Sequence, residues 1–266
     1  MVNGKMANGK GINNMNIVMI GAGNLATNLA HALHQAGHNI EQVYSRTEES
    51  ACMLAQCFNC KRTNDISCVV STADVYVLAL KDSVLADVAD RLMKGREGQL
   101  FVHTAGSMPM DTLTAGRRGV FYPMQTFSKN RLVSFADIPV FVEASNADDE
   151  SLLRTLALSL SGSVYTLSSA DRQYLHVAAV FASNFSNHCY RLSEKLLAKH
   201  GIPFSVMLPL IDEVAGKVHS VSPKEAQTGP AVRRDANVIA KHLAMLDDDE
   251  ETKRIYELMT NSIIND

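Results

Sequence analysis

Short apolar runs alternate with segments of helical periodicity over the first two thirds of the chain. Between these runs, apolar residues recur three or four positions apart, as on one face of an α-helix. Such alternation favours an α/β fold with a doubly wound, mostly parallel sheet, in which ligands bind beyond the carboxyl ends of the strands. The predicted strands are residues 17–20, 40–44, 75–80, 100–103, 120–122, 140–143 and 164–167.

From residue 168 onward the pattern is helical throughout. Residues 171–200 form one long helical stretch that Gly201 and Pro203 end. The segment 220–230, with two prolines and a glycine, is the clear break that follows. Further helices are predicted at 204–219, 232–246 and 251–264.

The change of pattern predicts two domains after a polar leader. The first fourteen residues are mostly Gly, Asn and Lys and have no apolar core, so we expect residues 1–14 to be disordered. Residues 15–167 are expected to form a nucleotide-binding domain of the Rossmann type, and residues 168–266 an all-α domain for substrate binding and dimerisation.

The first predicted strand runs directly into Gly21-x-Gly23-x-x-Ala26 and then into a helical pattern. Gly21 permits a tight turn, Gly23 lets the backbone approach a pyrophosphate, and Ala26 lets the helix pack closely on the strand. The amides of Asn24 and Leu25 would then face the phosphates at the positive end of the helix. This context, rather than the glycines alone, predicts a dinucleotide site.

The residues after the second strand indicate which dinucleotide binds. Where an NAD enzyme carries an acidic residue for the ribose hydroxyls, this chain has Ser45-Arg46-Thr47. Two hydroxyls and a guanidinium suit the 2′-phosphate of NADP. The structural alternative is that Ser45 and Thr47 only cap the next helix while Arg46 is solvated, and both roles can hold together. We predict NADP as the cofactor.

Composition and charge exclude several other classes. The 266 residues are 46% hydrophobic with a net charge of −3, so no basic excess points to nucleic acid. No apolar run reaches membrane-spanning length. Cys57-x-x-Cys60 has neither a second pair nor a nearby His to complete a zinc site, so we expect no metal. The odd cysteine total fits a reducing, cytoplasmic location.

Three loops follow predicted strands at the edge where a cofactor would bind. In the first, Leu80 and Lys81 would pass beside the nicotinamide half, although a solvated lysine is the plain alternative. In the second, His103 ends a strand and could bond cofactor or substrate, although a histidine packed at a strand end is commoner. The third presents Gln125 and Thr126 after an X-Pro turn.

The middle of the long helical stretch carries a polar sector in apolar surroundings. Its members are Ser183, Asn184, Asn187 and His188. Asn184 and His188 are four residues apart and project to the same side, so they could hold one small acceptor. Hydrogen bonding within a helix bundle explains the sector equally well. The functional hypothesis makes Asn184 the group that orients the acceptor and His188 or His103 the proton donor.

Together these motifs resemble a known family. The chain is similar to the Rossmann-like proteins with a DUF2520 helical domain, and through them to pyrroline-5-carboxylate reductase and to F420-dependent NADP reductases. The resemblance covers 15–264, with one departure: Arg234 stands where we expect Gly in an Arg-Gly-Asp sequence. It rests on residues 21–26, Ser45-Arg46, 103–106, 123–127, 178–185, Gly229-Pro230, Arg233, Asp235 and His242.

Two functions from different classes are open at this point. The resemblance implies an NADPH-dependent oxidoreductase, which would transfer hydride to a small carbonyl or imine bound between the domains. The alternative is a non-catalytic NADP-binding sensor or scaffold, because a Rossmann fold does not establish catalysis. The resemblance and the apolar residues of 174–197 also imply a homodimer formed through the helical domain.

Overall fold

The computed structural model describes residues 14–266, and it contains one eight-stranded sheet in the order β3-β2-β1-β4-β5-β6-β7-β8. Neighbouring strands are parallel except for the antiparallel pair β6 and β7. The predicted α/β class and sheet are therefore confirmed. The strands are β1 (Asn16–Ile20), β2 (Asn39–Tyr44), β3 (Lys61–Thr63), β4 (Val75–Leu78), β5 (Leu100–His103), β6 (Arg117–Pro123), β7 (Val140–Ala144) and β8 (Val164–Thr166).

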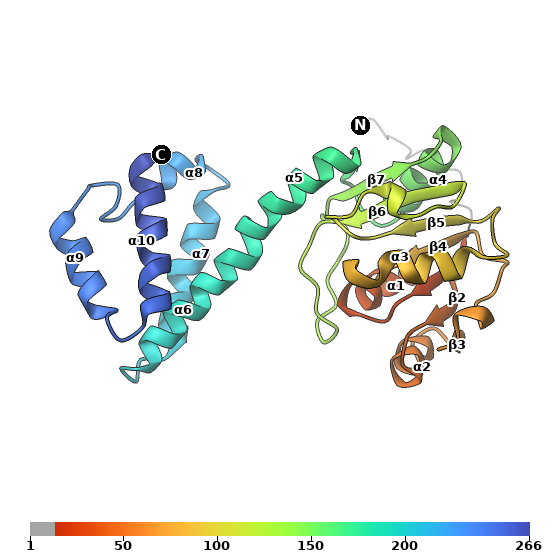
Figure 1. Ribbon diagram of the computed structural model, residues 1–266, viewed down its shortest axis with the longest axis horizontal. Helices are drawn as coiled ribbons and strands as arrows, with labels where there is room; N and C mark the ends of the chain where they lie inside the picture. The colour runs from red at the N-terminus through yellow and green to blue at the C-terminus, as the bar shows by residue number, and fades with distance from the viewer. Residues whose placement is uncertain (1–13) are drawn as a thin grey trace, which may run out of the picture. The chain divides into compact units, whose positions relative to one another are not determined.

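Helices cover both faces of this sheet (Figure 1). Alternate residues of β1 belong to different cores: Ile17 and Met19 pack with α1, α2 and α4, whereas Val18 and Ile20 pack with α3. Strands buried on both faces explain the near-continuous apolar runs in the sequence. These helices are α1 (Asn24–Gln35), α2 (Glu48–Gln56), α3 (Asp82–Met93) and α4 (Ala147–Leu158), with short 3₁₀ turns at Ile66–Cys68 and Met110–Thr112.

The chain leaves β1 toward β2 and β3 and later returns to β4 on the other side of β1. The strand order therefore reverses between β1 and β4, and such a switch point is where open α/β sheets bind ligands, beyond the carboxyl ends of their strands. The first turn and the loops after β4, β5 and β6 all belong to this edge, because these strands run parallel.

The chain divides into two compact units, one up to Ser183 and the other Asn184–Asp266. The first unit includes the sheet and α5 (Ser169–Ala179), so it extends past residue 167. The division at 167 into a nucleotide-binding domain and a substrate domain remains a prediction. Of the predicted leader, only Asn14 lies within the described residues. No described helix is long and apolar enough to cross a membrane.

The second unit contains helices only. Lys195 of α6 (Ser186–Ala198) and Lys199, the residue that ends this helix, form ion pairs with Asp249 and Asp248 at 2.7 and 2.8 Å. His242 Nδ1 and the Tyr256 hydroxyl lie 2.8 Å apart and join α9 to α10. The helices are α6 (Ser186–Ala198), α7 (Leu208–Lys217), α8 (Pro223–Ala226), α9 (Ala236–Met245) and α10 (Glu250–Asn265), with a 3₁₀ turn at Phe204–Met207.

The structure refines three details of the helical prediction. The stretch 171–200 is helical without a gap from Ser169 to Ala198, and a π-helical segment at Val180–Phe185 lies between α5 and α6. The break at 220–230 contains the short helix α8. The helix predicted from residue 232 begins only at Ala236, because Asp235 caps it by accepting a bond from the Val238 amide at 3.2 Å.

Candidate functional site

The turn after β1 has the geometry that a dinucleotide-binding turn requires. Gly21 has φ +118°, and a Cβ there would overlap the carbonyl oxygen of Ala79 at the end of β4. The Gly21 amide donates to the Tyr44 carbonyl at 2.8 Å, so the turn is also bonded to β2. Only glycine meets both the backbone angle and the close approach. The turn is therefore held between β2 and β4, the two strands on either side of β1.

The start of α1 presents backbone amides without a competing side chain. Gly23 is the N-cap, its side-chain space is open, and no side chain caps the helix. The first turn contains no acidic residue, and Ala26 is fully buried against the sheet. The amides at Asn24 and Leu25 together with the helix dipole fit a pyrophosphate. The open space at Gly23 leaves room for such a group.

The Ser45-Arg46-Thr47 segment lies at the carboxyl end of β2. Thr47 accepts a bond from the Ser50 amide at 3.4 Å, so it does cap α2, and the Ser45 amide donates to the Thr63 carbonyl. Arg46 is exposed and forms no ion pair within residues 14–266. The structural alternative therefore holds for Thr47 and leaves Arg46 available for an anionic ligand.

Loops after β4 and β5 continue this edge. The Thr104 amide donates to the Leu78 carbonyl at 3.2 Å, which joins the two loops. The Ser107 hydroxyl bonds the carboxylate of Asp82 at the start of α3. Lys81 is exposed as the N-cap of α3 and its side chain does not cap the helix, and Leu80 is half-buried beside it. The two predicted residues of the first loop therefore belong to the same edge as the turn.

His103 is fully buried, and both its ring nitrogens bond to the backbone. Nδ1 accepts from the Ala105 amide at 3.2 Å, so Nε2 carries the proton and donates to the Pro109 carbonyl at 3.2 Å. Burial, and next the nearby Arg172, lower the pKa of His103 to about 4. A neutral imidazole with both nitrogens engaged supports a structural role for His103, in shaping the loop after β5.

A polar pair that the sequence analysis missed lies next to that loop. The Tyr122 hydroxyl, near the end of β6, is 3.2 Å from Nδ1 of His176 on α5. Both side chains crowd Gly106: a Cβ there would lie 2.5 Å from His176 Nδ1 and 2.9 Å from Tyr122 Cζ. Because the pair is 54 positions apart in sequence, no local pattern joins it.

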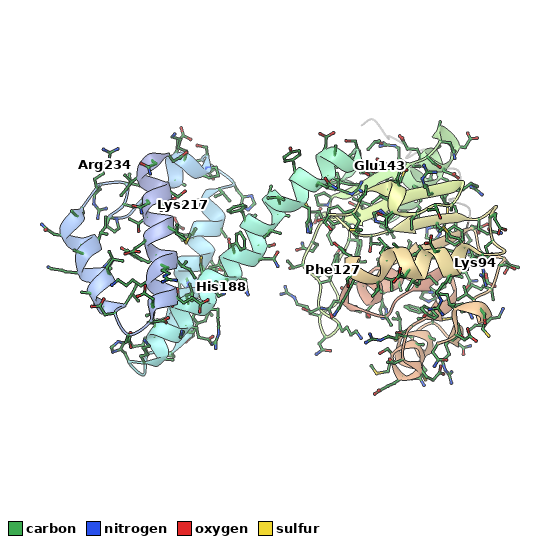
Figure 2. All side chains as sticks on the ribbon, viewed as in Figure 1. Lys94, Phe127, Glu143, His188, Lys217 and Arg234 are labelled. Carbon is green, nitrogen blue, oxygen red and sulfur yellow. The ribbon has the colours of Figure 1, made fainter. Side chains whose placement is uncertain are left out.

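A buried ion pair holds α5 on the sheet beside this pair. Arg172 is fully buried, and its Nη1 lies 2.5 Å from Oε2 of Glu143 on β7. Its Nη2 donates to the Met108 carbonyl at 2.6 Å, and Gln173 donates to the Ser107 carbonyl at 3.0 Å. Glu143 is labelled in Figure 2. These bonds fix the start of α5 to the loop after β5.

The other predicted catalytic residues belong to the helical unit. Asn184 lies in the π-helical segment and His188 in the first turn of α6, and both side chains are exposed. His188 is labelled in Figure 2. Ser183 donates to the Ala179 carbonyl at 2.6 Å within its own helix. π-Helical turns inside α-helices occur frequently at functional sites. The role of Asn184 and His188 stays a prediction.

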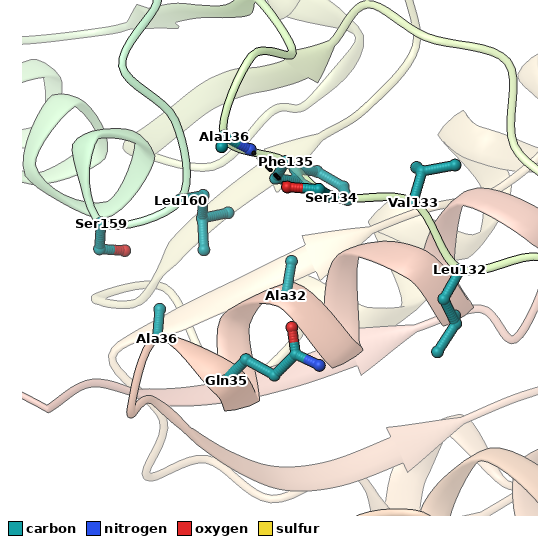
Figure 3. Close-up of a pocket in the computed structure, with 10 residues that line it drawn as sticks. All are labelled: Ala32, Gln35, Ala36, Leu132, Val133, Ser134, Phe135, Ala136, Ser159 and Leu160. Carbon is teal, nitrogen blue, oxygen red and sulfur yellow. Dashed lines mark hydrogen bonds between the residues drawn. The ribbon is translucent and has the colours of Figure 1, made fainter.

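A hollow of about 410 Å³ lies on the first unit, and Figure 3 shows the residues that line it. Ala32, Gln35 and Ala36 line it from the carboxyl end of α1, opposite Ser134 and Phe135 of the loop before β7. The amides that would bind phosphate are at the other end of α1. This hollow is therefore separate from the cofactor edge.

The fold and the turn define the class of Rossmann-type dinucleotide-binding proteins. Two family models match the chain: "NADP oxidoreductase coenzyme F420-dependent" over residues 16–106 and "Domain of unknown function (DUF2520)" over residues 138–263. A Bacteroides fragilis protein, named a putative NADP oxidoreductase, is 52% identical, with a TM-score of 0.92 over 96% of this chain and 100% of its own. The chain therefore belongs to the family of Rossmann-like proteins with a DUF2520 domain.

More distant structures share the fold. An imine reductase from Myxococcus stipitatus, solved in complex with NADP+, has 16% identity and a TM-score of 0.68 over 93% of this chain and 92% of its own. A 1-pyrroline-5-carboxylate reductase from Streptococcus pyogenes has 15% identity and a TM-score of 0.61 over 95% and 99%. No curated protein matches the chain.

Proposed function

We propose that this protein is an NADP-dependent oxidoreductase that transfers hydride from NADPH to a small carbonyl or imine. The observation that carries the proposal is the turn at Gly21, whose positive φ and contact with Ala79 place an uncapped helix start at the switch point of the sheet. Family membership supports the same cofactor, since the relative at 52% identity is named for NADP. When bound, the nicotinamide supplies the hydride chemistry, and the chain supplies position and polarity.

Arg46 accounts for the choice of NADP over NAD. Its guanidinium follows β2, where the adenosine ribose lies in this fold, and it has no ion-pair partner in the described part of the chain. A 2′-phosphate would give Arg46 a charge-assisted bond, and a 2′-hydroxyl would not. Ser45 and the Thr47 hydroxyl stand beside it as further donors.

Calorimetric titration of Arg46→Ala tests this assignment. Loss of one charge-assisted phosphate contact costs about 1.5 to 3 kcal/mol, so NADPH affinity should fall roughly tenfold or more while NADH affinity stays nearly constant. Arg254→Ala is the matched control, because Arg254 is an exposed arginine of α10, 72% accessible and paired with Glu250. Equal affinity of the wild-type protein for NADPH and NADH would overturn the assignment.

For the acceptor, we assign Asn184 and His188 to substrate binding. The π-helical segment at Val180–Phe185 supports this, since it interrupts the helix at the polar sector that the sequence analysis singled out. Asn184→Ala and His188→Ala should abolish turnover and leave NADPH affinity and folding intact. Asn261→Ala, at an exposed asparagine of α10 outside the polar sector, is the matched control.

We also propose that the helical unit forms a homodimer. Among its hydrophobic residues only Ala231 and Leu246 are buried, whereas Leu210 and Leu258 are 58% and 71% exposed. The unit Asn184–Asp266 has 83 residues, and a unit of this size needs more buried apolar surface than this to be stable. A second copy of the same helices would bury that surface. Light scattering should give twice the chain mass of 29.0 kDa at tens of micromolar, and a monomer would contradict the proposal.

A further inference from the structure

Tyr122 and His176 form a hydrogen-bonded pair at the carboxyl edge of the sheet. The hydroxyl oxygen and Nδ1 are 3.2 Å apart, and the two rings meet edge to face with centroids 6.1 Å apart. Tyr122 is 8% exposed, and His176 is half-buried in the last turn of α5. Both residues belong to the sheet-containing unit, so the pair is complete within one compact body.

A continuous set of contacts runs from the nucleotide turn to this pair. Gly21 packs on the backbone of Ala79 after β4, and the β4 strand end bonds the Thr104 amide after β5. Two residues later, Gly106 leaves room for His176 and Tyr122. In a doubly wound sheet the second nucleotide of the cofactor lies beyond the strands on this side of the switch point. The pair is therefore on the nicotinamide side of the site.

We propose that the Tyr122 hydroxyl is the proton donor of the reduction and that His176 then reprotonates the Tyr122 oxygen. This rests on the proposed function. Hydride adds to the carbon of the C=O or C=N bond, and the π electron pair of that bond moves to the oxygen or nitrogen. That heteroatom takes the proton of the Tyr122 hydroxyl. The Tyr122 oxygen takes the Nδ1 proton of the His176 imidazolium, and water reprotonates the imidazole.

The surroundings of each group suit its part. Burial raises the pKa of Tyr122 above the ordinary value for a phenol, which keeps the hydroxyl protonated at neutral pH. The half-buried His176 is more exposed to water than Tyr122, which is 8% exposed. Arg172, one helical turn before His176, is fixed by Glu143 and so holds the position of α5. Arg172 is thus a positioning residue for the pair.

Gly106 offers a way to displace the pair without removing either group. Its φ is not in the left-handed region, so alanine fits the backbone, but the added Cβ would lie 2.5 Å from His176 Nδ1. Gly116 has open space around it and serves as the matched control. Gly106→Ala should therefore separate Tyr122 from His176, whereas Gly116→Ala should change nothing.

The test measures steady-state NADPH oxidation with small imines and ketones, including 2-methyl-1-pyrroline and cyclohexanone. Tyr122→Phe should lower kcat about a hundredfold or more, as loss of a general acid does, with NADPH affinity changed less than twofold. His176→Gln and Gly106→Ala should lower kcat at least tenfold. In wild type, a solvent deuterium isotope effect on kcat should accompany proton transfer from the phenol.

The failure of this inference is distinguishable from that of the proposed function. If wild type oxidises NADPH with an acceptor and Tyr122→Phe keeps its kcat, the pair has no catalytic role although the oxidoreductase assignment stands. If Tyr122→Phe loses activity only because NADPH no longer binds, its role is structural, and the inference is wrong. If wild type binds NADPH but no acceptor is reduced, the proposed function fails, and the pair's role with it.

Discussion

Glu143 neutralises a fully buried guanidinium, so Glu143→Gln should destabilise the protein strongly. The variant keeps the side-chain size but leaves Arg172, 1% exposed in its side chain, without a counter-ion. Removing one partner of a buried ion pair costs about 3–5 kcal/mol, whereas an exposed pair contributes about 0–1. Because the Glu143 side chain is 18% exposed, we expect the lower part of the buried range, about 3 kcal/mol.

Urea unfolding followed by far-ultraviolet circular dichroism measures this loss, since the chain has no Trp for fluorescence. The double variant Glu143→Gln with Arg172→Met removes both charges together. It should be more stable than the sum of the single losses predicts, by more than about 1 kcal/mol. A loss below about 1 kcal/mol for Glu143→Gln, or additive single losses, would refute the reasoning from burial.

Two further predictions concern the residues of the site. The pKa of His103 is lowered to about 4 in the folded state, so between pH 6.5 and 4 the unfolded chain binds a proton at His103 that the folded chain does not. The free energy of unfolding is therefore unaffected by His103 above about pH 6.5 and falls as the pH drops toward 4. Between pH 7 and 5 the loss should be about 2 kcal/mol in urea unfolding, and His103→Gln should flatten that dependence; an unchanged slope would contradict it. Gly21→Ala should abolish measurable NADPH binding in calorimetry and lower the free energy of unfolding by at least about 1–3 kcal/mol, because Gly21 has φ +118° and a Cβ there would overlap Ala79. Gly98→Ala is the control, since Gly98 has open space around it, and it should match wild type in both measurements.

The sequence was sufficient for the sheet and its nucleotide turn because both depend on local rules. Buried parallel strands require apolar runs, and a turn with positive φ against another strand requires glycine. The same locality explains one miss: β3 is a three-residue edge strand, Lys-Arg-Thr, with no apolar residue. Such a strand is defined by its pairing with β2, and no pattern within its own three residues predicts that pairing.

Residues that meet across the fold could not be predicted in the same way. The sequence marks His103 as a candidate proton donor because it ends a strand, but its burial and its bonds to the backbone depend on how the following loop packs. Tyr122 and His176 are brought together by β6 and α5, and the one residue type that their contact requires is a glycine at position 106. Arg234, which departs from the expected Gly, has φ +52°, so the backbone there keeps a conformation that suits glycine.

Transfer of the nicotinamide hydrogen to an acceptor tests the central claim most directly. The protein is incubated with NADPH deuterated at C4, in the R and S forms separately, and with the panel of small imines and ketones. Mass spectrometry should find one deuterium on the reduced carbon of the product from one of the two forms, and NADPH should be consumed in equal amount. Tight NADPH binding with no deuterium in any product would contradict the claim and favour a non-catalytic NADP-binding protein.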